Sequence, residues 1–157
     1  MHHLHIVLVE PEIPPNTGAI ARLCAATNTT LHLVEPLGFR LDDRELKRAG
    51  MDYWRQVTWH AWPDWAAFRA THAQARLHLL TTKVTRSYTQ ARFGPDDVLV
   101  FGRETKGLPE SLLAAHADQC LTIPMPNPAV RSLNLATAAA IVLYEALRQV
   151  GELQTEF

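Results

Sequence analysis

Short apolar runs alternate along the chain with segments whose apolar residues recur at helical spacing. The apolar runs have the length and the Val, Leu and Ile content of buried strands. We predict strands at residues 4–9, 31–34, 53–58, 77–81, 98–101 and 121–123. We predict helices at residues 16–27, 42–49, 64–73 and 133–150. Because strands and helices alternate, the pattern predicts an α/β fold, a mostly parallel sheet flanked by helices.

Residues at the ends of these helices support the assignment. Asn16 and Asp64 are of the type that caps a helix start, and Gly50 and Gly151 are typical stop signals. The last helix is rich in alanine and carries no charge until Glu145. Since this helix is apolar nearly all round, we expect it to be buried on every side.

Polar and charged residues gather at three junctions between loop and helix, at residues 14–22, 101–109 and 123–136. In the second, Gly102 follows an apolar strand and Glu104 falls at the carboxyl edge of the sheet, where open α/β sheets bind ligands. In the first, helical spacing predicts that Arg22 points away from the core. We therefore expect one composite site. The alternatives are a turn with solvated charges and an exposed arginine after a helix cap.

Composition limits the class of protein. The 157 residues, 47% hydrophobic and 20% charged, fit one globular domain spanning residues 1–157. The net charge of −1 argues against indiscriminate coating of nucleic acid. No G-x-G-x-x-G or P-loop pattern occurs, which disfavours a nucleotide-binding regulator. Cys24 and Cys120 are expected as buried thiols, with a disulfide as the lesser alternative.

We expect a reducing, cytoplasmic location. No signal-like apolar segment follows the N-terminal histidines. The longest uncharged run, residues 132–144, is too short to span a bilayer, so no membrane association is predicted.

The three junctions together resemble a known family. Residues 15–22, 101–108, and 123–125 with 132–136 resemble the three motifs of the SPOUT class of S-adenosylmethionine-dependent RNA methyltransferases, in its ribose 2′-O-methylating branch. Residues 10–18, 35–39 and 48–53 resemble the small tRNA (cytidine/uridine-34-2′-O)-methyltransferases, which modify the wobble nucleotide of leucine tRNAs. The resemblance covers essentially the whole chain.

The resemblance implies features that composition does not show. Such proteins are homodimers whose C-terminal part forms a trefoil knot, an exception to the rarity of knots. S-adenosylmethionine is expected to bind at Leu80, Gly102, Ile123 and Ser132. Arg22, Glu104 and Asn134 are expected at the reacting centre, with Asn16 supporting the first loop. We expect dimerisation through the last helix, with Tyr144 near the seam; burial within the core alone is the alternative.

Contact with a tRNA anticodon loop needs positive charge. Lys83, Arg86 and Arg92 lie in a segment without acids until Asp96, so we expect substrate contact there, especially from Lys83 and Arg86. Solvated loop charges are the alternative. The tryptophans of residues 54–65 could stack on unpaired bases, but packing of the protein or of a subunit interface is the favoured interpretation.

No metal site is predicted. The N-terminal histidines, His2, His3 and His5, lack a carboxylate or cysteine partner at ligand spacing. Two rival functions stay open: 2′-O-methylation of ribosomal RNA or another tRNA position, and RNA binding by a knotted protein without turnover.

Overall fold

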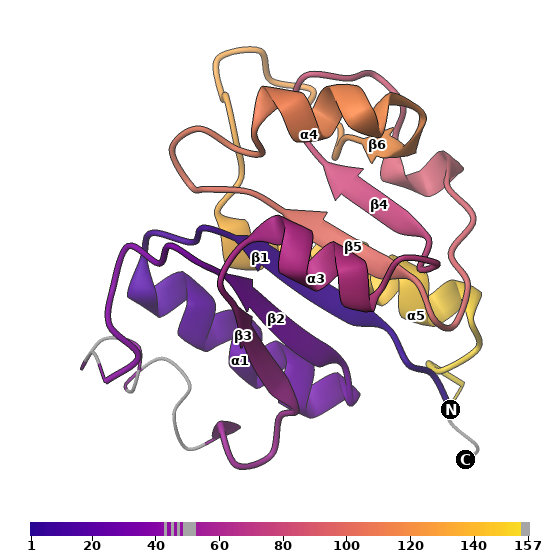
Figure 1. Cartoon of the computed structure of the whole chain (residues 1–157). Helices are drawn as coiled ribbons and strands as arrows, with labels where there is room; N and C mark the ends of the chain where they lie inside the picture. Colours follow the sequence, from indigo (N-terminus) through magenta and orange to yellow (C-terminus); the bar gives the residue numbers. More distant parts are fainter. Residues whose placement is uncertain (43, 45, 47, 49–52, 155–157) are drawn as a thin grey trace.

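A computed structural model describes residues 1–154 except 43, 45, 47 and 49–52. Within these residues six parallel strands form one sheet in the order β3-β2-β1-β5-β4-β6 (Figure 1). The strands are β1 (His5–Val9), β2 (Thr30–Val34), β3 (Trp59–Trp62), β4 (Leu77–Leu80), β5 (Val98–Phe101) and β6 (Cys120–Leu121). The helices are α1 (Pro14–Thr27), α3 (Trp65–Thr71), α4 (Glu110–Ala115) and α5 (Leu135–Gln149), with 3₁₀ turns η2 (Tyr88–Gln90) and η3 (Ala117–Gln119). The predicted α/β class is confirmed.

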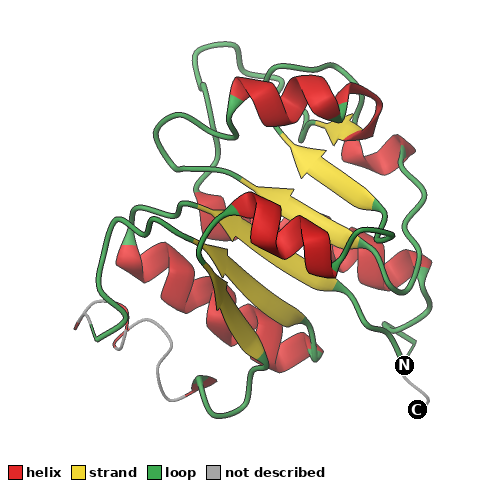
Figure 2. Cartoon of the chain, viewed as in Figure 1, coloured by secondary structure: helices red, strands yellow, loops and turns green. Residues whose placement is uncertain are grey.

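Helices cover both faces of the sheet, so the chain has three layers (Figure 2). Successive strand residues point to opposite faces. In β1, Ile6 and Leu8 join a core with α1 and α5, whereas Val7 and Val9 join a second core with α3 and α4. The near-continuous apolar strands are therefore explained by burial on both sides.

One predicted strand is wrong. Residues 53–58 form turns, in which the Gln56 N–H donates to the Tyr53 carbonyl at 2.8 Å. The edge strand is β3, which begins six residues after the predicted start and pairs with β2 from Leu31 onward. Aromatic residues populate both segments, so local propensity did not distinguish them, and pairing with β2 decides the outcome.

Two helix starts differ from the prediction by two residues each. Helix α1 begins at Pro14 with Ile13 as N-cap, so Asn16 lies in the first turn instead of capping it. Proline fits there because the first N–H groups of a helix have no partner inside it. Helix α5 begins at Leu135, and Asn134 is its cap. By contrast, Asp64 caps α3 as predicted, accepting from the Ala67 N–H at 2.8 Å. The predicted helix at 42–49 and its stop at residue 50 lie partly outside the described residues.

Helix α5 is not buried on every side of the single chain. Its Ala139 and Leu143 side is fully buried, but Thr137, Tyr144 and Arg148 are exposed, Tyr144 to 44%. These exposed positions recur at helical spacing and form one outer stripe.

Two further expectations concern the thiols and the membrane. Cys24 and Cys120 are free and buried, and burial raises the pKa of both thiols. In the part of the chain that the structure describes, no helix is long and apolar enough to cross a membrane.

Candidate active site

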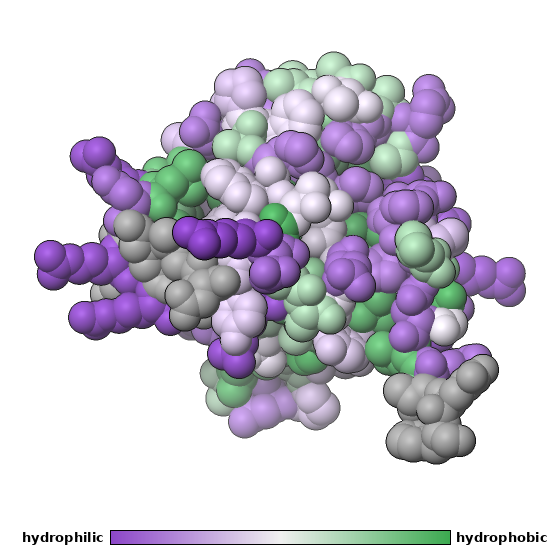
Figure 3. All heavy atoms as spheres, turned by 90° about the horizontal axis from the view of Figure 1, so that it is seen from below, coloured by the Kyte–Doolittle hydropathy of each residue, from purple (hydrophilic) through white to green (hydrophobic). Residues whose placement is uncertain are grey.

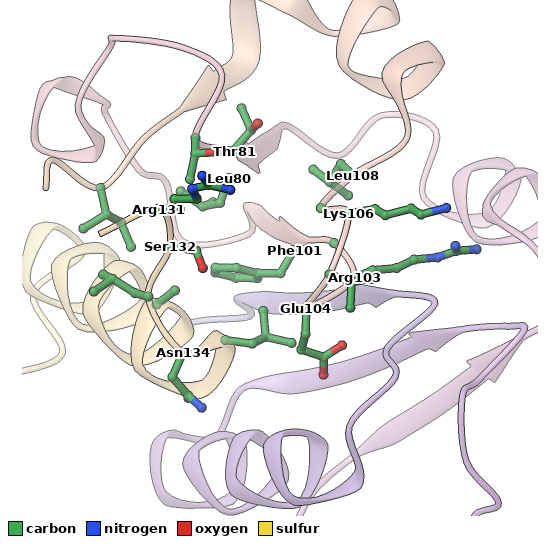
Figure 4. Close-up of a pocket in the computed structure, with 18 of the residues that line it drawn as sticks. Leu80, Thr81, Phe101, Arg103, Glu104, Lys106, Leu108, Arg131, Ser132 and Asn134 are labelled. Carbon is green, nitrogen blue, oxygen red and sulfur yellow. The ribbon is translucent and has the colours of Figure 1, made fainter. Parts of the chain in front are cut away.

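A cavity of about 550 Å³ lies at the carboxyl ends of β4, β5 and β6, the edge at which parallel sheets bind ligands (Figure 4). All three sequence junctions contribute to its wall. The lining comprises Ile13, Asn16, residues 80–83, residues 101–108, Thr122, Ile123, Met125, residues 131–135 and Ala138. Its volume is within the range of small-molecule sites.

Hydrogen bonds tie the three junctions together. The Asn134 side-chain amide donates to Asn16 Oδ1 at 3.0 Å, which joins the third junction to the first. Asn134 Oδ1 in turn accepts from two N–H groups at the start of α5, so one side chain caps this helix and fixes the contact. Because both amides use donor and acceptor atoms, the position of α5 relative to α1 is set by this pair.

Glu104 joins the second junction to the first. Its Oε2 accepts from the Glu12 N–H at 2.9 Å, and its Oε1 accepts from the Ile13 N–H at 3.1 Å and from Asn16 Nδ2 at 3.5 Å. Figure 4 shows both Glu104 and Asn134 directed toward α1. The carboxylate thus satisfies backbone donors just before α1, which have no partner within the helix.

A reciprocal contact strengthens this link. The Thr105 hydroxyl and N–H donate to Glu12 Oε1 at 2.7 and 3.1 Å. These hydrogen bonds lower the pKa of Glu12 below its usual value, because they favour the charged carboxylate. Arg103, from the same loop, pairs with Glu10 at 2.8 Å and points away from the cavity in Figure 4.

Gly102 stands where the chain cannot accept a side chain. A Cβ atom there would lie 2.2 Å from both the Gly107 carbonyl carbon and the Leu108 nitrogen. The loop closes on itself through two backbone hydrogen bonds, from Arg103 N to Gly107 O at 3.2 Å and from Gly107 N to Arg103 O at 2.9 Å. The cavity wall here is therefore backbone folded against backbone.

All four residues predicted to bind the cofactor line the cavity: Leu80, Gly102, Ile123 and Ser132. Ser132 does so from the loop before α5 and not from the helix start, where the cap is Asn134. Glu104, Asn134, Asn16 and Lys83 line the same cavity.

Arg22 is the exception among the residues expected at the reacting centre. It is exposed on α1, off the core as its spacing predicts, and is absent from the cavity lining. Its guanidinium carbon lies 4.9 Å from the centre of the Tyr53 ring, in a cation–π contact. A single chain does not bring this arginine to the cavity.

The two expected substrate contacts are placed differently. Lys83 Nζ pairs with Glu110 at 2.5 Å, and this hydrogen bond and charge lower the pKa of the Glu110 carboxyl. Arg86 lies outside the lining, and its guanidinium donates to the Gln90 carbonyl at 3.5 Å. Sequence reasoning missed Arg131, a cation on the cavity wall whose position beside Ser132 in the third junction was the available signal.

The tryptophans contribute to packing. The rings of Trp54 and Trp59 meet edge to face at 4.8 Å and pack against the α1/α5 core. Trp62 and Trp65 contact Phe68 on the other face at 5.9 and 5.3 Å. The packing interpretation is confirmed for these rings.

Comparison with known proteins now decides the family. The sequence model of the SpoU rRNA Methylase family matches residues 3–144, nearly the whole of the described chain. The chain belongs to this family. A tRNA (cytidine(34)-2′-O)-methyltransferase from Saccharophagus degradans is 52% identical over 151 residues, covering 94% of this chain and 96% of the relative.

Solved structures agree with the SpoU assignment. One that describes the 2-OH methylation of C/U34 on tRNA has a TM-score of 0.90 and 48% identity, covering 94% of this chain and 96% of that one. The SpoU methyltransferase AviRb from Streptomyces viridochromogenes, in complex with the cofactor AdoMet, has a TM-score of 0.81 and 26% identity, covering 94% of this chain and 60% of that one. The resemblance to SPOUT-class methyltransferases is thereby confirmed, as is the fold they share.

Proposed function

We propose that this SpoU-family protein transfers a methyl group from S-adenosylmethionine to the ribose 2′-hydroxyl of nucleotide 34, cytidine or a modified uridine, in leucine tRNAs. The observation that carries the proposal is the meeting of all three motif junctions in one cavity, within a chain about half identical to a named position-34 methyltransferase. The family name refers to rRNA, but the names of the full-length relatives favour tRNA.

The construction of the cavity supports the proposal that it holds S-adenosylmethionine. Three loops present backbone, with Gly102 allowing its loop to close on itself at the wall and Leu80 and Ile123 offering apolar contact, while Ser132 supplies a hydroxyl. The bound cofactor supplies a methyl group already activated by its sulfonium. Much of the remaining barrier can be lowered by alignment, worth up to about 7–11 kcal/mol in ideal systems. We assign Leu80, Gly102, Ile123 and Ser132 to holding it.

Arg22 is proposed to reach the cavity from a second copy of the chain. In one chain it is exposed outside the lining, whereas Asn134 and Glu104 are inside. The outer stripe of α5, with Tyr144 exposed to 44%, offers a surface for a homodimer. A symmetric pairing through α5 would give each cavity one guanidinium from its neighbour.

The proposed role of Arg22 is electrostatic. A guanidinium stays protonated in proteins, so it cannot take the hydroxyl proton itself. It can stabilise the alkoxide that develops on the attacking oxygen and can hold a phosphate in bidentate fashion. Both oxygens of Glu104 already accept loop N–H groups, which favours a positioning role for this carboxylate and departure of the proton to water or phosphate.

RNA contact is proposed for the surface around the cavity mouth. In Figure 3 long hydrophilic side chains project at the left, the side toward which the strands run in Figure 1. Lys83 and Arg86, together with Asn16 at the cavity, are the assigned substrate contacts. Because Lys83 is paired with Glu110, RNA phosphate must compete for it, and we expect binding that weakens as salt rises. A cytoplasmic location agrees with the two free thiols.

The direct test is methylation of tRNA that lacks the modification at position 34. Purified protein, labelled S-adenosylmethionine and leucine tRNA should yield label in the ribose of nucleotide 34, located by nuclease digestion and mass spectrometry. The matched control is the same tRNA with a 2′-deoxynucleotide at position 34, which should take up no label. Label on a base, on another nucleotide or on ribosomal RNA in preference would refute the proposal.

Subunit mixing tests the second copy. Arg22→Ala and Asn134→Ala variants should each be inactive, because each spoils every site of its own homodimer. Mixed and re-associated, half of the dimers are heterodimers with one intact site of two, so about a quarter of the parent activity should return. If Arg22 acts within its own chain, no activity returns. Sedimentation of the parent as a monomer would equally contradict the arrangement.

A further inference from the structure

Three histidine rings meet on the α3 face of the sheet. His5 begins β1, His32 lies within β2, and His72 directly follows α3. One ring nitrogen of each lies within 4.8 Å of the corresponding nitrogens of the other two. None of the three lines the proposed methyl-transfer cavity, which lies at the carboxyl ends of β4, β5 and β6. Sequence reasoning considered only the N-terminal histidines, because His32 and His72 are distant in the chain.

The hydrogen bonds around His32 define where its proton sits. The Trp62 indole N–H donates to His32 Nδ1 at 3.0 Å, so this nitrogen carries no proton. A neutral His32 then carries its proton on Nε2, from which it donates to His5 Nδ1 at 2.8 Å. Two ring nitrogens of different strands thus share one proton.

The third ring is oriented by a carbonyl. His72 Nδ1 lies 3.3 Å from the Phe68 carbonyl oxygen, which can only accept, so Nδ1 is the donor. This leaves His72 Nε2 with a free lone pair. A carbonyl that fixes the tautomer of a histidine in this way is a common feature around metal-ligating imidazoles.

We propose that His5, His32 and His72 form a binding site for a divalent transition metal ion of the zinc type. Tetrahedral zinc holds imidazole nitrogens at about 2.0–2.1 Å, and therefore about 3.3 Å from one another. The present separations, from 2.8 Å for His5 and His32 up to at most 4.8 Å, bracket that spacing, so small side-chain rotations suffice.

The ligand set selects the class of ion. Three imidazoles suit zinc, copper or nickel, whereas magnesium and calcium prefer oxygen. His5 and His72 are partly exposed, so an ion can enter and a fourth position can hold water. The bound ion would join β1, β2 and the end of α3, and should stabilise the fold without touching the cavity.

The hydrogen bond from Trp62 to His32 disfavours metal binding. For His32 Nε2 to bind a metal, its proton must move to Nδ1, where it would face the indole N–H. Replacing Trp62 by Phe keeps an aromatic ring and removes this conflict. Zinc binding should then tighten about two- to tenfold, the range that one ordinary hydrogen bond represents.

The test uses the full chain without an affinity tag. Zn²⁺ is titrated calorimetrically, and Co²⁺ is added separately, because tetrahedral cobalt has a visible absorption signature. One equivalent should bind and raise the thermal midpoint. His72→Gln should weaken binding about tenfold or more, since it removes a ligand. His116→Gln, a change far from the cluster, should not, and methyl transfer should be the same in both variants.

Trp62→Phe provides a second measure with a matched control. Its gain in zinc affinity should not occur in Trp59→Phe, on the same strand. The competing explanation is that the histidine rings only pack. The His72 ring, for example, stacks on the Phe68 ring with 4.7 Å between their centres. Absence of stoichiometric zinc binding by the parent, or binding that His5→Gln and His72→Gln leave unchanged, would establish packing alone and overturn the proposal.

Discussion

Substitution of Gly102 by alanine should damage both the fold and the cavity. The added Cβ would lie 2.2 Å from the Gly107 carbonyl carbon and the Leu108 nitrogen. These are backbone atoms, so no side-chain rotation relieves the overlap, and the loop must open.

The size of the effect follows from what opening removes. Overpacking of this kind costs about 1–3 kcal/mol. The two hydrogen bonds between Arg103 and Gly107 contribute about 1 kcal/mol each. We therefore expect the free energy of unfolding to fall by about 3–5 kcal/mol. Because residues 102–108 line the cavity, S-adenosylmethionine binding should weaken in parallel.

Chemical denaturation and calorimetric titration with S-adenosylmethionine measure the two effects. The matched control is Gly94→Ala, whose Cβ would lie 3.3 Å from a side-chain atom, Asp97 Oδ1, and no closer to backbone. We expect that variant to lose less than about 1 kcal/mol and to keep the parent cofactor affinity. A Gly102→Ala protein within about 0.5 kcal/mol of the parent, with unchanged affinity, would refute the reasoning.

Three further results are expected from denaturation experiments. Asn134→Ala loses a helix cap and the bond to Asn16, and should cost about 1–3 kcal/mol, whereas Asn134→Asp should retain the cap part. Burial raises the pKa of Asp97, but hydrogen bonds, first from His78, bring it below its usual value. The charged Asp97 should therefore stabilise the fold above about pH 4, and this stabilisation should be lost as the pH falls further. Asp97→Asn should lack this acid transition. Burial and neighbouring imidazoles lower the pKa of His32 to about 3. Below about pH 6.5 the unfolded chain therefore binds more protons than the folded one, and the free energy of unfolding should fall as the pH falls. This fall should be less steep in His32→Leu.

The sequence predicted the central strands well because burial on both faces leaves a distinct signature. Apolar runs ending at Val9, Val34 and Phe101 match β1, β2 and β5 at their carboxyl ends. The edge strand β3 was misplaced because its middle residues are exposed and its sequence resembles the preceding turn. The position of β3 is determined by pairing with β2, which is distant in sequence, so the local pattern did not predict it.

Within the site, the motifs predicted the loops but not the contacts between them. Glu104 was expected at the sheet edge, and its binding to the Glu12 N–H depends on two segments 92 residues apart. The same limit applies to the histidine cluster, whose members come from three elements. Helical spacing correctly predicted that Arg22 points away from the core. That it lies outside the cavity lining is visible only in the structure.

The contacts join two residues proposed for the reacting centre, Glu104 and Asn134, within one chain. Asn134 holds Asn16, Asn16 and the backbone beside it hold Glu104, and Thr105 returns to Glu12, so one chain closes all three junctions around the cavity. Arg22 takes no part in these contacts and lies against the Tyr53 ring, exposed on α1. The cavity proposed to hold the cofactor is thus walled by one chain, and the cations on that wall include Lys83 and Arg131. In the proposed homodimer, a second copy would add its exposed Arg22 to this wall.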